Sequence, residues 1–194
     1  MKRLLIAICM LLAGCQEGTK PPVAVAPVVK PSQNPSKKYP KYLPDTAAIL
    51  ANQNLIKLLA AVMRDTLVEY RKASAIPPVI SAFLHQNDSL YNEPFAMADY
   101  GHRYNAGCTP EKGLPGRQLR YLGVGQRTCL LAYNVGGVGV FTRVLLFEVR
   151  HDSILDYWTG ILGNQATNKL GIVTQLLNSK DAPWRHYSGQ RLML

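Results

Sequence analysis

The sequence predicts an α+β fold, in which N-terminal helices and a C-terminal helix pack against an antiparallel meander of three to four strands. Two observations support this prediction. Between residues 47 and 74, apolar residues recur every three or four positions, which is the period of a helix with one buried face. Between residues 128 and 162, β-branched and aromatic runs are separated by short turn signals, which is typical of hairpins.

The first helix is expected to begin at Ala47, because Asp45 or Thr46 can cap its first turn. It should end near Ser74, since the proline at position 77 disfavours helical backbone at the residue before it. The side chains expected on its buried face are Ile56, Leu59, Ala60, Met63, Leu67 and Tyr70.

A shorter helix should follow from Val79 to Gln86, because Pro78 suits the first turn of a helix. Residues 87–120 are rich in Asn, Gly, Pro and Tyr, so we expect a long ordered loop with at most short elements.

One hairpin forms the centre of the predicted sheet. Its strands should span 128–135 and 138–150, joined by a two-residue Gly-Gly turn. In that register Val135 pairs with Val138, and Cys129 pairs with Val144. Both faces are apolar apart from Arg143, so the hairpin should be covered on both sides.

A third strand is expected over 154–162, and a C-terminal helix over 168–177. The helix residues expected to face inward are Leu170, Val173, Thr174 and Leu177. The globular domain should therefore cover 45–182, followed by a basic, aromatic tail over 183–194.

Length and composition exclude two classes of protein. The chain has 194 residues, of which 47% are hydrophobic and 18% charged, so it is not wholly disordered. No apolar run reaches the roughly 18 residues of a spanning helix, which excludes a polytopic membrane protein.

The N-terminus has the features of an export signal. Basic Lys2 and Arg3 precede an apolar stretch over 4–12, and small residues follow it. The segment Leu12-Ala13-Gly14-Cys15 resembles the lipobox of bacterial lipoproteins. The alternative is an ordinary secretory signal with a chance cysteine.

The lipobox resemblance implies a signal peptide over 1–14 and attachment of acyl chains such as palmitate to Cys15. The protein would then be anchored to a membrane through these chains. Gln16 stands where an Asp tends to retain Gram-negative lipoproteins at the inner membrane. The resemblance therefore favours the outer membrane, facing the periplasm, with the inner membrane as the alternative.

Residues 15–44 should form a disordered tether, since prolines and lysines alternate there with few large apolar groups. The full chain carries a net charge of +10, and loss of Lys2 and Arg3 leaves +8. An exported chain does not normally meet nucleic acid. The expected partners are an anionic envelope component or an acidic protein.

Cys108 and Cys129 remain after Cys9 leaves with the signal peptide and Cys15 is acylated. In an oxidising periplasm such a pair predicts a disulfide, which would contribute about 3 kcal/mol to stability. Two free thiols are the alternative.

The sequence shows no convincing catalytic, metal or cofactor motif, so we expect a protein that is not an enzyme and needs no cofactor. Cys108, His151 and Asn164 follow the chain order of one family of cysteine-dependent cell-wall peptidases, but the family's Asp-Cys-Ser-Gly motif is missing. Acidic residues near the hairpin, including Glu148 and Asp156, should be solvated or paired with Arg143 and Arg150.

Residues 99–127 are the best candidate for a binding surface, because arginine and tyrosine are enriched at recognition sites. The residues expected to contact a partner are Arg103, Tyr104, Arg117, Arg120 and Tyr121. A solvated basic loop is the alternative.

The expected function is a lipid-anchored periplasmic binding or accessory module for an envelope or secretion component. An inhibitor or immunity protein is the second hypothesis, and a Cys-dependent cell-wall hydrolase the third.

Overall fold

A computed structural model describes residues 38–87, 95–137, 139–162 and 166–179. Within them, five strands form one antiparallel sheet in the order β1-β2-β3-β4-β5, so that each strand pairs with its neighbours in the chain. The strands are β1 (Val68–Tyr70), β2 (Arg117–Val124), β3 (Thr128–Val135), β4 (Phe141–Arg150) and β5 (Ser153–Leu162). The predicted α+β meander is confirmed, with five strands where three to four were expected.

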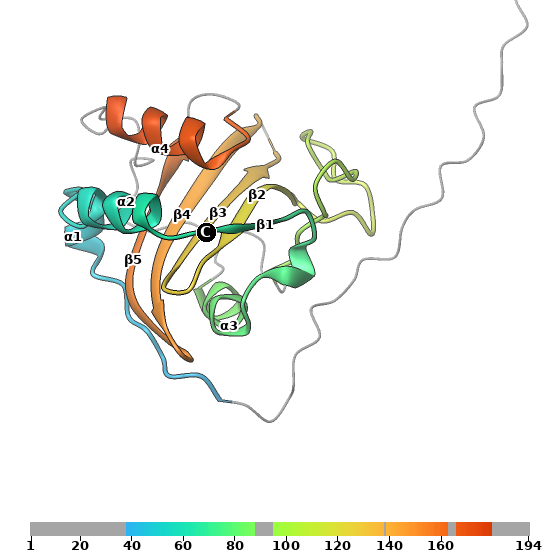
Figure 1. Ribbon diagram of the computed structural model, residues 1–194. Coiled ribbons are helices and arrows are strands. Elements are labelled where there is room, and N and C mark those ends of the chain that lie inside the picture. The colour runs from blue at the N-terminus through green and yellow to red at the C-terminus, as the bar shows by residue number, and fades with distance from the viewer. Residues whose placement is uncertain (1–37, 88–94, 138, 163–165, 180–194) are drawn as a thin grey trace, which may run out of the picture.

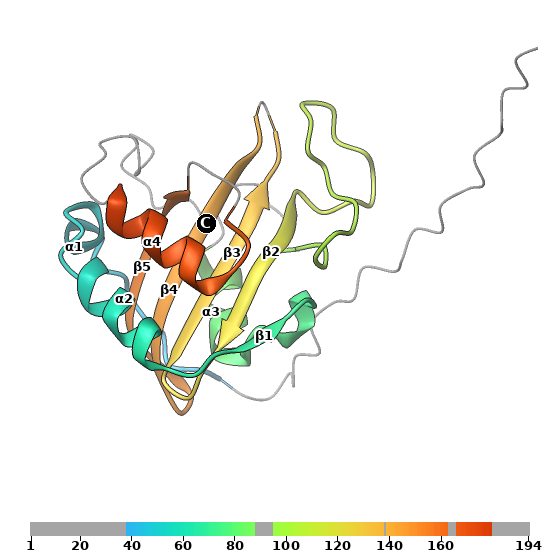
Figure 2. The ribbon, with the colours of Figure 1, turned by 45° about the horizontal axis from the view of Figure 1, so that its top comes forward.

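Helices cover both faces of this sheet. They are α1 (Thr46–Leu50), α2 (Leu55–Arg64), α3 (Pro78–Asn87) and α4 (Lys169–Asn178), with a short 3₁₀ turn at Ala73–Ala75. Figures 1 and 2 show α2 and α4 side by side across one face, with α1 beside β5 and α3 on the opposite face. Both faces of the central strands are therefore buried, as the apolar hairpin predicts.

The single helix expected from Ala47 to near Ser74 is wrong, because the chain leaves the helix between α1 and α2. Asn52 there has a left-handed backbone (φ 56°), and its side chain accepts a hydrogen bond from Trp158 Nε1 at 3.0 Å. Asn54 Nδ2 donates to the carbonyl oxygen of Tyr157 at 2.7 Å. Hydrogen bonds to β5 thus stabilise a break that the local sequence does not require.

Of the two predicted ends of the first helix, the N-terminal one is confirmed and the C-terminal one is wrong. The cap at Asp45 is confirmed, since its carboxylate accepts the backbone N–H of Ala48 at 3.0 Å. The C-terminal end is wrong, because α2 stops at Arg64 and residues 68–70 form β1, which pairs with β2.

The buried faces of α2 and α4 are also shifted from the prediction. Ile56 and Met63 were expected inside but are 49% and 45% exposed, and Leu170 is 63% exposed. Leu59 and Val173 are buried as expected, and the other buried residues are Leu55, Leu58 and Val62 on α2, and Ile172 and Leu176 on α4. Each turn of α2 carries two adjacent apolar residues, so the sequence fits two neighbouring faces and tertiary packing selects one.

The hairpin between β3 and β4 exists, but its predicted register is wrong by three residues. Val135 pairs with Phe141 and Cys129 with Phe147, so the connection is the five-residue segment 136–140 rather than a two-residue turn. The third strand and the two later helices are confirmed. Asn168 caps α4, where its side chain accepts the N–H of Gly171 at 2.8 Å.

The predicted loop over 87–120 ends in a strand, because β2 begins at Arg117. Tyr39 and Tyr42 pack against the core, so residues at the end of the predicted tether belong to the domain. The signal peptide, Cys15, most of the tether and the tail over 183–194 lie outside the described residues. None of the described helices is long and apolar enough to cross a membrane.

Candidate functional site

Residues 99–116, here the Asn105 loop, extend beyond the β2 side of the sheet (Figure 1). The Asn105 side chain organises this loop with three hydrogen bonds to backbone atoms. Its Nδ2 donates to the carbonyl oxygens of Glu111 (3.1 Å) and Leu114 (2.7 Å), and its Oδ1 accepts the Glu111 N–H at 2.7 Å. An exposed segment without helix or strand is therefore held in one conformation.

The base of the Asn105 loop is joined to the sheet. Gln118 Nε2 donates to the carbonyl oxygen of His102 at 2.6 Å, and the Gly136 N–H donates to Gly116 O at 3.0 Å. A Cβ atom at Gly136 would overlap the backbone carbonyl of Asn105, so glycine is required at this close approach. The loop and the β3–β4 connection thus form one continuous surface.

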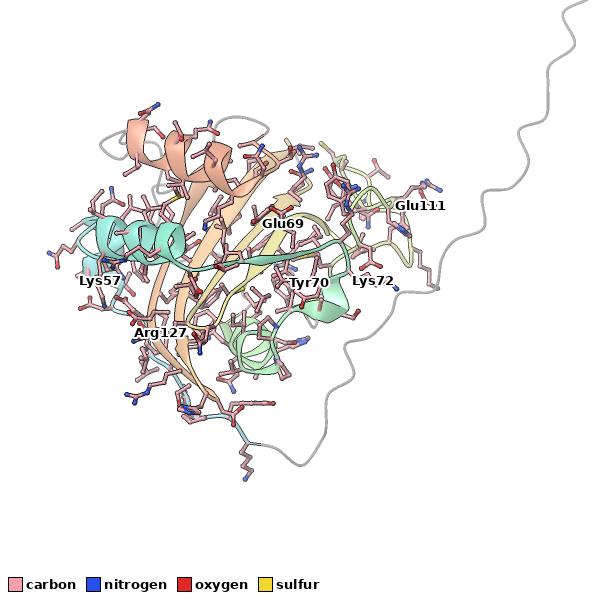
Figure 3. The ribbon with its side chains drawn as sticks, in the orientation of Figure 1. Lys57, Glu69, Tyr70, Lys72, Glu111 and Arg127 are labelled. Carbon is pink, nitrogen blue, oxygen red and sulfur yellow. The ribbon has the colours of Figure 1, made fainter. Side chains whose placement is uncertain are left out.

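Two arginines lie on or beside the Asn105 loop. Arg103 forms an ion pair with Glu111 at 2.7 Å, and the two side chains are 59% and 55% exposed. The Arg71 guanidinium lies 4.8 Å from the centre of the Tyr100 ring. Figure 3 shows Lys72 just beyond β1, on the side of the molecule that carries Glu111. The exposed ion pair contributes little to stability, so Arg103 is available for another anion.

Two of the five predicted contact residues are buried, which corrects the predicted binding surface. Arg117 is only 2% exposed, and its guanidinium stacks 4.4 Å from the centre of the Phe95 ring. Tyr121 is 4% exposed, and burial together with the nearby Glu69 carboxylate raises its pKa. Tyr104 and Arg120 are half-buried. Of the five, only Arg103 is exposed.

A β-bulge in β2 places Arg117 and Tyr121 on opposite faces of the sheet. In a regular strand Arg117 and Tyr121 would point to the same face, because they are four residues apart. The register between β2 and β3 shifts between Leu119 and Tyr121, so Leu119 pairs with Tyr133 while Tyr121 pairs with Ala132. Arg117 therefore points toward the α3 face and Tyr121 toward the α2 face.

The predicted Cys108–Cys129 disulfide is wrong, because both cysteines are free. Cys129 is buried near the start of β3, whereas the exposed Cys108 thiol lies 3.6 Å from Gly137 O, beyond the other end of that strand. The six residue-to-residue steps from Cys129 to Val135 alone span about 20 Å at the rise of a strand. A disulfide needs Cα atoms within about 7 Å of each other.

A second polar group lies inside the domain, between the sheet and α3. The Arg143 cluster consists of Tyr133, Arg143, Tyr157 and Thr159, none of which is more than 4% exposed. Arg143 Nη1 lies 3.5 Å from Thr159 Oγ1, and the guanidinium is 5.7 Å from the centre of the Phe141 ring. Burial raises the pKa of Tyr157 well above its ordinary value, opposed by the Thr159 hydrogen bond and the Arg143 charge.

The carboxylates expected to pair with Arg143 are occupied elsewhere. Lys57 Nζ lies 3.0 Å from Asp156 and 3.1 Å from Glu148, which also pairs with Arg127 at 3.3 Å. Glu148 and Arg143 are five residues apart on β4, and successive side chains on a strand alternate between faces. Their predicted pairing is therefore wrong.

The sequence carried one signal for the Arg143 cluster, since a charged residue interrupts an apolar strand that is covered on both faces.

Among the described residues, no group of three or more His, Cys, Asp or Glu side chains is arranged to hold a metal ion. Comparisons with protein-family models, curated proteins and solved structures found no match to this chain.

Proposed function

We propose that this protein is a lipid-anchored binding module of the bacterial cell envelope, attached by acyl chains on Cys15 and facing the periplasm. The observation that carries the proposal is the segment Leu12-Ala13-Gly14-Cys15, which follows a basic and then apolar N-terminus. One acyl chain holds a protein only weakly, whereas two or three make a stable anchor. The outer membrane is the proposed site and the inner membrane the alternative.

The chain between the anchor and the domain supports a module that reaches away from the membrane. Residues 16–38 are rich in proline and lysine, and Tyr39 already packs against the core. At about 3.1 Å per residue in a polyproline II conformation, this segment would span roughly 70 Å. Its lysines would also be attracted to anionic headgroups, by about 1 kcal/mol each near the surface.

The Asn105 loop is the proposed recognition surface. It combines an exposed guanidinium on Arg103 with a backbone conformation that the Asn105 side chain already holds. A preformed loop loses little conformational entropy when it binds. Its partner would be an anionic envelope component or an acidic protein, since guanidinium pairs bidentately with carboxylate and phosphate.

An inhibitor or immunity protein is the second candidate, and the same loop supports it. A rigid projecting loop with an exposed arginine could enter an acidic cleft of a target enzyme. The identity of the partner separates the two candidates, because an inhibitor would be recovered with an enzyme and an accessory module with an envelope component.

Membrane fractionation of cells that produce the full chain tests the anchor. The wild-type chain should stay with membranes after a high-salt wash and incorporate labelled palmitate, whereas Cys15→Ser should do neither. The salt matters because lysines could hold the chain by electrostatic attraction alone. A Cys15→Ser chain that remains membrane-bound in high salt would show that lipidation is not the anchor.

Crosslinking in cells followed by mass spectrometry tests the binding role. A chain with Arg103→Ala should recover less of the partner than the wild type. Lys57→Ala is the matched control, because Lys57 is equally basic and exposed but lies on α2, away from the Asn105 loop. Equal recovery with both variants would remove the Asn105 loop as the recognition surface.

A further inference from the structure

The guanidinium of Arg143 is buried without a counter-charge among the described residues. Arg143 is 4% exposed, and its contacts there are a long hydrogen bond to Thr159 and the face of Phe141. None of the described carboxylates forms an ion pair with it. A buried charge normally needs a partner of opposite charge or several acceptors, so this arrangement is incomplete as it stands.

Two polar atoms of the Arg143 cluster are available to a ligand. Arg143 Nε is buried without a hydrogen-bond partner, and the buried Tyr157 hydroxyl has no acceptor for its own proton in the protein. The Thr159 hydroxyl engages Nη1, which leaves the edge formed by Nε and Nη2 uncommitted. That edge presents two parallel N–H donors, the arrangement that a carboxylate accepts in a bidentate pair.

The surroundings of the Arg143 cluster select the kind of anion. Rings of Phe83, Phe147 and Tyr157 pack against one another on this face, with centroids 4.9 to 5.7 Å apart. Apolar ring walls do not replace the hydration of a phosphate dianion, which carries two negative charges. A carboxylate carries one negative charge, which the single guanidinium neutralises. An apolar body on that carboxylate would in turn be favoured by contact with the apolar side chains of this face.

The same face becomes partly exposed beside Arg143. Phe141 precedes Arg143 by two residues on β4, and Ile161 is paired with Arg143 on β5, so all three point to one face. Phe141 and Ile161 are half-buried, in contrast to the fully buried Leu145 and Tyr157 further along the strands. A ligand would approach Arg143 from this end of the sheet.

We propose that the Arg143 cluster binds the carboxylate of a small apolar acid, with the acid held side-on by the guanidinium and by the Tyr157 hydroxyl. This inference deepens the proposed binding function by naming a ligand class. It is independent of the lipid anchor and of the Asn105 loop, so its failure would leave the results for Cys15 and Arg103 unchanged.

Calorimetric titration of the Cys15→Ser chain, which carries no acyl group, tests the ligand class. Hexanoate should bind, while hexan-1-ol, acetate and inorganic phosphate should each bind at least about tenfold more weakly. Hexan-1-ol lacks the charge, acetate lacks the apolar body, and phosphate lacks both the shape and the single charge. Equal binding of hexanoate and hexan-1-ol, or preferential binding of phosphate, would overturn the proposal.

Variants then test the residues. Tyr157→Phe keeps the ring and should weaken hexanoate binding several-fold, and Arg143→Lys keeps the charge but loses the bidentate edge and should weaken it at least tenfold. Lys57→Ala, on α2 at the opposite face of the sheet, is the control and should bind as the wild type does. In nitrogen NMR of the wild-type chain, the Arg143 Nε–H signal should shift with hexanoate, a result that needs no variant to fold. Unchanged binding by both cluster variants, or an unshifted signal, would overturn the assignment.

Discussion

The carboxylate of Asp65 accepts two hydrogen bonds from Thr128, one from the backbone N–H at 3.0 Å and one from the hydroxyl at 2.9 Å. It also accepts the N–H of Arg127 at 3.0 Å. Asp65 directly follows α2, and Thr128 begins β3, so one side chain joins the end of a helix to the turn between two strands.

Replacing Asp65 with alanine should lower the free energy of unfolding by about 1–3 kcal/mol, because it leaves the N–H and hydroxyl of the buried Thr128 without their acceptor. Chemical denaturation monitored by circular dichroism measures this loss. Glu111→Ala is the control, since its exposed ion pair with Arg103 should contribute less than about 1 kcal/mol. A smaller loss for Asp65→Ala than for Glu111→Ala would contradict the structural role of Asp65.

The same carboxylate should make stability depend on pH. Burial alone would raise the pKa of Asp65, but hydrogen bonds from Arg127, Thr128 and Gln126 outweigh it and lower the pKa below its ordinary value. The stabilisation is therefore complete above the unfolded pKa of about 3.9 and is lost as pH falls through the lower folded pKa. The stability difference between wild type and Asp65→Asn should shrink between pH 4 and pH 2. A difference that is constant from pH 7 to pH 2 would rule this out.

The two cysteines should react very differently with iodoacetamide. Cys108 is exposed, whereas Cys129 is fully buried and burial raises its pKa, which keeps it in the unreactive thiol form. Peptide mapping of the native chain should find Cys108 alkylated and Cys129 protected until denaturant is added. Recovery of a Cys108–Cys129 linked peptide from periplasmic material would instead restore the disulfide.

Gly136→Ala should loosen the Asn105 loop, because the new Cβ overlaps the carbonyl of Asn105. Trypsin should then cleave faster after Arg103 and Lys112 within the loop. Gly139→Ala, in the same β3–β4 connection, is the matched control, since a Cβ there meets no atom within 4 Å. Equal cleavage of the two variants would show that the loop does not depend on this contact.

The sequence predicted which parts of the chain are helix or strand better than how they pair and pack. The strand over 153–162 and the helix from Asn168 onward were found because their periodicity and caps are local. The register of the β3–β4 hairpin was missed, because Gly136-Gly137 indicates a tight turn while the structure connects Val135 to Phe141 through five residues.

The candidate site was predictable only in part, for a similar reason. Arg103 is exposed as expected, but the burial of Arg117 and Tyr121 depends on a bulge between Leu119 and Tyr121 and on what covers each face. The Asn105 loop is ordered by hydrogen bonds to residues up to nine positions away, which composition does not reveal. Arg143 was visible as an interruption of an apolar strand, but its neighbours on β3 and β5 follow only from the register.

Arg117 and Arg103 should separate folding from binding when each is replaced by alanine. Arg117→Ala removes the stacking on Phe95 and leaves a cavity, so the free energy of unfolding should fall by about 2–4 kcal/mol. Arg103→Ala should change it by less than about 1 kcal/mol, because its ion pair is exposed. Arg103→Ala should instead lose about 2 kcal/mol of partner-binding free energy. Arg117→Ala should keep its affinity for the partner. Denaturation and a binding assay on the same two variants measure both effects, and a stable Arg117→Ala chain that fails to bind would place Arg117 at the recognition surface after all.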